Sequence, residues 1–158
     1  MSVWEYILSK LAPVLWSLQN LRWRLFQPTT LGVKLLLIRE GHVLLVRQTY
    51  LPGWHLPGGG VKHHEEILHA IRREAREEVG ATMNDVRLFG AYTEPPFGRS
   101  GYVLVFVARD FVLRPSRNWE IADIGSFPLG SLPADTDPAT KRRVEEFIAD
   151  GGPVVGRW

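Results

Sequence analysis

The chain has 158 residues, of which 45% are apolar and 23% charged, and this suits one globular domain with a real core. Its 19 basic and 17 acidic residues leave a net charge of only +2, too small an excess to indicate a nucleic-acid-binding protein. Cysteine is absent, so disulfides and thiolate metal sites are excluded, and any metal must be held by oxygen or imidazole.

Residues 1–28 have apolar side chains at helical spacing, broken at Pro13, and are predicted to form an amphipathic helical extension. Charged and amide residues interrupt the segment before it reaches the roughly 20 apolar residues that a membrane span needs. It also lacks the early positive charge and the cleavage site of a secretory signal. We therefore expect a cytoplasmic protein with no membrane span. The tryptophans of this segment are expected to pack on the domain or on a second subunit in a homodimer, with membrane-surface contact as the alternative.

Residues 29–150 alternate strands with helices, which predicts a single α/β domain with a mixed sheet. The first two strands flank Gly41 and are expected to form a hairpin. A loop rich in proline and glycine occupies 49–60. The apolar and β-branched runs predict strands at 31–40, 43–48, 85–94, 101–113 and 120–129.

Helices are expected in two places after the loop. The first covers roughly 65–79 and is capped by Gly80. The second begins at Pro138, with Asp137 as its N-cap, and runs to residue 148. The remaining residues, 151–158, are predicted to be a flexible C-terminal tail.

Three glutamates, Glu74, Glu77 and Glu78, crowd the last turn of the first of these helices. They lie on one face, where they repel each other, and the negative end of the helix dipole opposes them further. Interleaved arginines such as Arg73 could explain them as part of a surface helix with many ion pairs. A divalent cation such as Mg²⁺ or Mn²⁺ is the alternative, because such ions prefer carboxylate oxygens and often bind phosphates as well. Both explanations fit the spacing.

The residues from Gly59 to Ala81 resemble the signature of the Nudix hydrolases, G-x5-E-x7-R-E-U-x-E-E-x-G-U, in which U is bulky or aliphatic. Every fixed position matches. Alanine at both U positions is a mild departure, and so is His64, where the family usually has glycine. The preceding WHLPGG also resembles the family, so the likeness is clear over about 31–81 and diffuse over 82–150.

This resemblance implies a Nudix-type α/β/α sandwich that cleaves a diphosphate bond with Mg²⁺ or Mn²⁺. It implies that Glu77 and Glu78 are the principal metal ligands. Glu74 would be a further ligand or the base that activates water, and Gly58 could offer its carbonyl oxygen to the metal. In such a site, the cation polarises phosphoryl oxygens while the protein positions the reacting groups.

The resemblance also implies supporting roles for residues around these ligands. Arg73 would orient the carboxylates through ion pairs. Glu65 would support the junction between loop and helix or bind a second metal through water. A base from outside the motif is common in the family, and the candidates are Glu94 and Glu120, for which the alternative is an ordinary surface acid.

Substrate-binding residues are predicted on both sides of the motif. Gly59 and Gly60 let the backbone approach a ligand closely. Arg47 stands at a strand end, where it could grip a phosphate, with an exposed strand-end charge as the alternative. Trp54 and Phe97 could stack on a base, with ordinary packing as the alternative.

The expected substrate is a nucleotide-type small molecule, and ADP-ribose or a nucleotide sugar is the first candidate. Pro96, beyond the motif, resembles a feature of ADP-ribose-cleaving members. A nucleoside triphosphate, ordinary or oxidised, is the second candidate. From another class, a Nudix-fold sensor that binds nucleotides without turnover is the alternative, although it would have no need of the complete acidic set. Cleavage at the 5′ end of RNA would need a basic groove that the sequence does not indicate, so no nucleic-acid partner is expected.

Overall fold

The structure, a computed structural model, describes residues 29–94, 101–114, 118–149 and 152–158. The predicted extension over 1–28 lies outside the described residues, as do Pro96 and Phe97. In chain order the elements are β1 (Thr30–Arg39), β2 (His42–Gln48), β3 (Trp54–His55), α2 (Ile67–Val79), β4 (Ala81–Met83), β5 (Arg87–Glu94), β6 (Gly101–Ala108), β7 (Phe111–Leu113), β8 (Ile121–Pro128), α3 (Pro138–Ile148) and β9 (Val154–Arg157).

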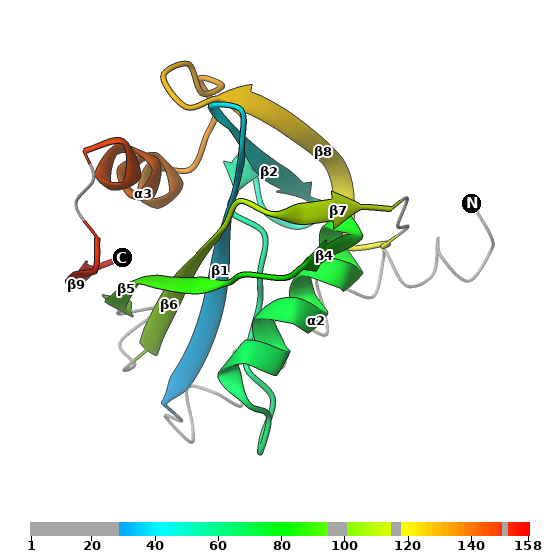
Figure 1. The fold of residues 1–158 in the computed structure, drawn as a ribbon, viewed down its shortest axis with the longest axis vertical. Coiled ribbons are helices and arrows are strands. Elements are labelled where there is room, and N and C mark those ends of the chain that lie inside the picture. The colour runs from blue at the N-terminus through cyan, green and yellow to red at the C-terminus, as the bar shows by residue number, and fades with distance from the viewer. Residues whose placement is uncertain (1–28, 95–100, 115–117, 150–151) are drawn as a thin grey trace.

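The larger sheet is mixed and has the strand order β3-β2-β1-β6-β5-β9, with β8 also paired to β2. β1 runs parallel to β6, and β9 runs parallel to β5, while β5 and β6 are antiparallel. β4 and β7 form a separate antiparallel pair. Figure 1 shows α2 and α3 on opposite sides of the larger sheet. The predicted α/β/α sandwich with a mixed sheet is therefore confirmed.

The hairpin of β1 and β2 separates soon after its turn, and this separation creates room for the glycine loop. Only Ile38 with Val43 and Arg39 with His42 are in register between the two strands. Farther from the turn, the edge of β1 instead forms hydrogen bonds with loop residues 57–61. Their N···O distances are 2.9 Å, as from Val33 N to Gly59 O. The loop is thus fixed along β1, between the two halves of the sheet.

The two faces of β1 contribute to two separate cores because side chains alternate along a strand. Leu35 and its neighbours on one face pack with Ile71 and Ala75 of α2. Leu36 and its neighbours on the other face pack in the cluster that holds Val144 of α3. The period-two pattern of an almost wholly apolar strand accounts for a layer of helix on each side.

Both predicted helices are present, and their ends follow from local chemistry. α2 ends at Gly80, whose φ of 66° lies in the left-handed region that glycine adopts at little cost. α3 begins after Asp137, whose side chain accepts a hydrogen bond of 2.8 Å from Thr140 N. Among the described residues, no helix is long and apolar enough to cross a membrane.

Three predictions about strands need correction. The strand expected over 101–113 is two strands, because the chain turns at Arg109 and Asp110 between β6 and β7. The loop expected over 49–60 contains the short strand β3. The tail expected to be flexible contains β9, which pairs in parallel with β5, and the Trp158 ring packs 5.9 Å from that of Tyr92. Such pairing with a distant strand leaves little trace in a four-residue segment.

Candidate functional site

The glycine loop lies directly against the carboxylates of α2. Gly58 N donates a hydrogen bond of 2.7 Å to Glu78 Oε2. A side chain on Gly59 would place its Cβ 2.8 Å from the Glu74 carboxylate, closer than real Cβ atoms come. Gly58 has a φ of 131°, and a Cβ there would lie 2.1 Å from Val33 O. Glycine is therefore required at position 58 for the loop to pass along β1, while a side chain at position 59 would displace the Glu74 carboxylate.

Glu74 and Glu78 are buried side by side on α2, with 9% and 4% of their surfaces exposed. Burial raises the pKa of Glu78, and the negative charge of Glu74 raises it further. Lys34 and the hydrogen bonds from Gly58 and Gln48 act in the opposite direction. A buried acid with a raised pKa beside a second acid is an arrangement common at functional sites.

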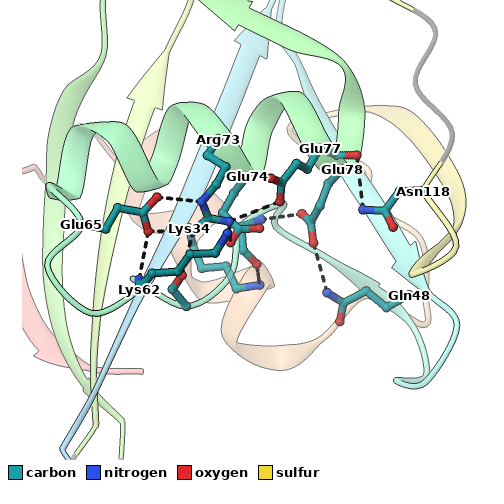
Figure 2. A network of polar contacts seen from close by, with 11 residues as sticks. Lys34, Gln48, Lys62, Glu65, Arg73, Glu74, Glu77, Glu78 and Asn118 are labelled. Atoms are coloured by element: carbon teal, nitrogen blue, oxygen red, sulfur yellow. Dashed lines mark hydrogen bonds and ion pairs between the residues drawn. The ribbon is translucent and has the colours of Figure 1, made fainter. Parts of the chain in front are cut away.

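Arg73 gathers the other acids of the motif, as Figure 2 shows. Its guanidinium donates from Nε and Nη2 to both oxygens of Glu65, at 2.7 and 2.9 Å. Nη1 lies 2.6 Å from Glu74 Oε1 and 3.3 Å from Glu77 Oε2. Chiefly because of the Arg73 hydrogen bonds, the pKa of Glu65 falls to about 2. This geometry supports the expected orienting role of Arg73.

Glu65 lies just before α2 and fastens the loop to the helix. Its Oε2 also accepts a hydrogen bond of 2.9 Å from Lys62 N in the loop. One carboxylate thus bonds to the loop backbone and to an arginine of α2. This contact favours the loop-support role over the second-metal role that was the other expectation for Glu65.

The donor set fits a hard divalent cation in its chemistry, although groups of the protein already contact its oxygen atoms. Among the described residues, no three acidic or imidazole groups surround one point that a metal could occupy. Arg73 lies against Glu74 and Glu77, and Lys34 bonds to the Gly58 carbonyl. Carboxylate oxygens are ligands that Mg²⁺ and Mn²⁺ prefer, so the glutamates of α2 have suitable chemistry for such an ion.

Lys34 is a site residue that was not predicted. It lies on β1, is half-buried, and its Nζ donates to Leu56 O at 3.1 Å and to Gly58 O at 2.7 Å. Burial lowers its pKa, against the raising effect of acids that include Glu78 and Glu74. The signal in the sequence was a single lysine inside an otherwise apolar strand, a position where a charge needs a specific reason.

Glu120 is brought to the acids of α2, as expected for one of the two base candidates. Asn118 anchors its segment, since Nδ2 donates to Glu77 O at 3.3 Å and Oδ1 accepts from Glu120 N at 3.0 Å. Burial raises the pKa of Glu120, and Glu74 and Glu77 raise it further.

Glu94, the other base candidate, lies at the end of β5 in a different setting. Burial raises its pKa, and the charged groups that act on it are Lys34 and Asp137. Glu74 and Glu77 thus act on the charge of Glu120, whereas Lys34 and Asp137 act on that of Glu94.

Arg47 and Trp54 do not lie beside these acids. Gln48 reaches Glu78 on the α2 side, so the preceding residue of β2 faces the other side of the sheet. There Arg47 Nη2 bonds to Asp135 Oδ2 at 2.7 Å, and its guanidinium lies 4.8 Å from the Trp54 ring. Trp54 is only 7% exposed and packs edge-on against Phe127. For Trp54 this placement corresponds to the alternative of ordinary packing, while Arg47 is a half-buried, ion-paired residue near the end of β2.

Tyr50 is an exposed aromatic residue that lies close to the acids. Its side chain was not predicted to matter, although 47% of its surface is exposed. Partial burial, followed by the charges of Glu120, Glu78 and Glu74, raises its pKa to about 12. The hydroxyl therefore stays protonated near neutral pH.

Comparison with known proteins gives a family for most of the chain. Residues 28–147 match the family model of the NUDIX domain. An 8-oxo-dGTP diphosphatase of Buchnera aphidicola is 41% identical over 54 residues, which are 34% of this chain and 44% of that protein. An RNA pyrophosphohydrolase of Hydrogenovibrio crunogenus is 38% identical over 52 residues, which are 33% of this chain and 32% of that protein. The chain thus spans less than half the length of these curated relatives.

A solved structure extends the likeness over nearly the whole chain. The bifunctional NMN adenylyltransferase/ADP ribose pyrophosphatase from Francisella tularensis has a TM-score of 0.71 to this structure. The match covers 91% of this chain and 48% of that one, at 20% sequence identity. At this identity the likeness shows a shared fold and no more.

Proposed function

The chain belongs to the NUDIX domain family, and we propose that it hydrolyses a diphosphate bond in a nucleoside diphosphate linked to another moiety, using Mg²⁺ or Mn²⁺. One observation carries this proposal. Glu74 and Glu78 are buried together against a glycine loop, and burial and mutual repulsion raise the pKa of Glu78. A divalent cation would relieve that repulsion, and such ions commonly bind phosphates as well as carboxylates.

The proposed ligands are Glu74, Glu77 and Glu78, all on α2. A cation bound there would neutralise phosphoryl oxygens and lower the pKa of a bound water. Arg73 positions Glu74 and Glu77 through its contacts of 2.6 and 3.3 Å. Glu65 in turn fixes the guanidinium from the loop side, so that the carboxylates present their oxygens in one orientation.

Glu120 is the proposed general base. Its raised pKa brings the carboxylate nearer to neutral pH, where it accepts a proton more effectively than an ordinary glutamate. The Asn118 contacts connect its backbone to the C-terminal end of α2, and this connection supports the assignment. Its proposed task is to take the proton from the attacking water. Glu74 is the alternative base.

ADP-ribose and nucleotide sugars are the first proposed substrates. The exposed Tyr50 offers a surface on which a base could stack beside the acids. The Buchnera relative is named for a nucleoside triphosphate, which supports that class as the second candidate. The Hydrogenovibrio relative is named an RNA pyrophosphohydrolase, which adds RNA as a substrate class, and the small net charge of +2 argues against it here.

A substrate panel tests the proposal directly. Wild-type protein, Glu77→Gln and the matched control Glu145→Gln, an exposed glutamate of α3, are incubated with ADP-ribose, nucleotide sugars, dinucleoside polyphosphates, nucleoside triphosphates and 5′-triphosphate RNA. We expect turnover of one class that requires Mg²⁺ or Mn²⁺, is lost in Glu77→Gln and is kept in Glu145→Gln. Binding without turnover across the panel would instead identify a nucleotide sensor and reject the hydrolase.

A further inference from the structure

Lys34 contacts the glycine loop, and the NUDIX motif does not account for this contact. It belongs to β1 and lies on the same face of the strand as Leu36, so its side chain leaves the strand on the α3 side. The long side chain nevertheless reaches the loop, where Nζ donates to Leu56 O at 3.1 Å and to Gly58 O at 2.7 Å. These two carbonyls use two of the three donors of the ammonium group.

Gly58 is consequently held from both of its polar atoms. Its N–H donates to Glu78 Oε2 at 2.7 Å, while its carbonyl oxygen accepts from Lys34. Figure 2 shows Lys34 reaching this part of the site, next to the acids of α2. One residue of the loop therefore links the lysine to the carboxylate, and the loop is clamped between a cation and an anion.

The surroundings of the ammonium group resemble those of a bound metal ion. Two backbone carbonyl oxygens bind it directly, and the acids that act on its charge are Glu78, Glu74, Glu94 and Asp137. Oxygen ligands and nearby carboxylates are what a hard cation requires. Since two cations beside one carbonyl oxygen repel each other, an ammonium bonded to Gly58 O disfavours a divalent ion at the same oxygen.

We propose that Lys34 is a built-in cation of the site, which keeps the carbonyl oxygens of Leu56 and Gly58 for itself and confines the divalent ion to the carboxylates of α2. This inference rests on the proposed function, since it concerns the cation that this function requires. It assigns Lys34 as a positioning residue. Under this proposal, and contrary to the expectation for Gly58, its carbonyl oxygen does not bind the metal, because it already accepts from Lys34.

The inference makes a directional prediction about metal affinity. Removing the ammonium removes a repulsive charge and releases the Gly58 carbonyl, so a divalent ion should bind more tightly. A side chain that merely braces the loop would have the opposite effect, because losing it would loosen Gly58 and the attached Glu78. The sign of the change in affinity therefore separates the two roles.

The experiment is a Mn²⁺ titration of the full chain, in which electron paramagnetic resonance measures the free ion. The proteins are wild type, Lys34→Met, which keeps the length of the side chain, and Lys34→Arg, which keeps its charge. We expect Lys34→Met to bind Mn²⁺ at least about fivefold more tightly, or to take up one further ion per chain, and Lys34→Arg to match the wild type. Lys34→Gln, which keeps a donor for the carbonyls and loses the charge, should shift in the same direction as Lys34→Met.

Equal or weaker binding by Lys34→Met would overturn the inference and leave the proposed function standing, provided that the wild type binds Mn²⁺. Absence of Mn²⁺ binding by the wild type would overturn both. Circular dichroism and the melting temperature establish that each variant is folded. If Lys34→Met does not fold, the Lys34→Gln titration decides in the same way.

Discussion

The helices α2 and α3 carry nearly the same charge pattern and use it in opposite ways. Each has a pair of arginines followed by a pair of glutamates, Arg72 and Arg73 before Glu77 and Glu78 in α2, and Arg142 and Arg143 before Glu145 and Glu146 in α3.

In α3, Arg143 is 2% exposed, and its two terminal nitrogens donate to Glu146 Oε1 at 2.7 Å and to Arg157 O at 3.1 Å. Its guanidinium also lies 3.9 Å from the Tyr92 ring, while Tyr92 donates to the other oxygen of Glu146. These contacts join α3 to β5 and to the end of β9.

In α2 the acids outnumber the arginine that gathers them. Arg73 contacts Glu65, Glu74 and Glu77, while Glu78 accepts hydrogen bonds from two uncharged groups, Gly58 N and Gln48 Nε2. The ratio of acids to bases within one cluster, more than the presence of ion pairs, therefore distinguishes a candidate cation site from a structural contact.

The largest expected effect is on turnover, and it comes from removing the charge of Glu78. Glu78→Gln should lower metal-dependent turnover by about 1000-fold, because a lost ligand charge weakens the stabilisation of phosphoryl oxygens by several kcal/mol. Its melting temperature without divalent ions should not fall, since a buried charge is removed. The corresponding change in α3, Glu146→Gln, should leave turnover per folded molecule within about twofold. Steady-state kinetics and thermal melts check both, and comparable turnover in the two variants would contradict the distinction between the helices.

Arg143→Met should give the largest loss of stability. Removing one partner of a buried ion pair leaves Glu146 without its cation, so the free energy of unfolding should fall by about 3 kcal/mol. Urea unfolding measures this change. Turnover per folded molecule should stay at the wild-type value, and an unaltered urea midpoint would show that the buried guanidinium contributes little to the fold.

Arg73→Lys should have a smaller effect on activity than Glu78→Gln. Lysine keeps the charge but cannot reproduce the planar fork that bonds to both oxygens of Glu65 while facing Glu74. Turnover should fall by about 10- to 100-fold, as is typical when a residue that orients metal ligands is changed. Measurement of kcat and KM at saturating Mg²⁺ checks this. If kcat is retained, the orienting role of Arg73 is wrong.

The smallest expected effect is a pH dependence of stability in the absence of divalent ions. The pKa of Glu78 is raised in the folded protein, so above its usual value of 4.5 the folded state binds more protons than the unfolded state. The free energy of unfolding should therefore fall as pH rises through the window between 4.5 and the raised pKa. Glu120 contributes in the same direction. Melting curves in EDTA from pH 5 to pH 8 should show a shallower decline for Glu78→Gln than for the wild type, and identical slopes would refute the effect.

How far the sequence could predict this molecule depends on the distance over which each feature is encoded. α2 and its acids were predictable because helix periodicity, the Gly80 cap and the motif all lie within one short segment. Asp137 and α3 were predictable for the same reason. β9 was not, since its parallel pairing with β5 depends on residues some 60 positions away and leaves no local pattern.

The site shows the same limit. Arg47 and Trp54 have suitable chemistry, but neither lies beside the acids. Side chains alternate along β2, which places Arg47 on the opposite face, and tertiary packing buries Trp54 against Phe127. Lys34 had only one signal, a charge within an apolar strand, and nothing nearby in the sequence indicated that its partner would be Gly58. Glu120 could be proposed as an acid, although only the fold brings it to α2.

The most direct test of the central distinction is Mn²⁺ binding to wild type, Glu78→Gln and Glu146→Gln, measured by electron paramagnetic resonance. We predict that the wild type and Glu146→Gln bind Mn²⁺ with the same affinity and that Glu78→Gln loses most of that affinity. Retained binding in Glu78→Gln, or equal losses in both variants, would contradict the conclusion that α2 holds the cation site and that the acids of α3 are structural.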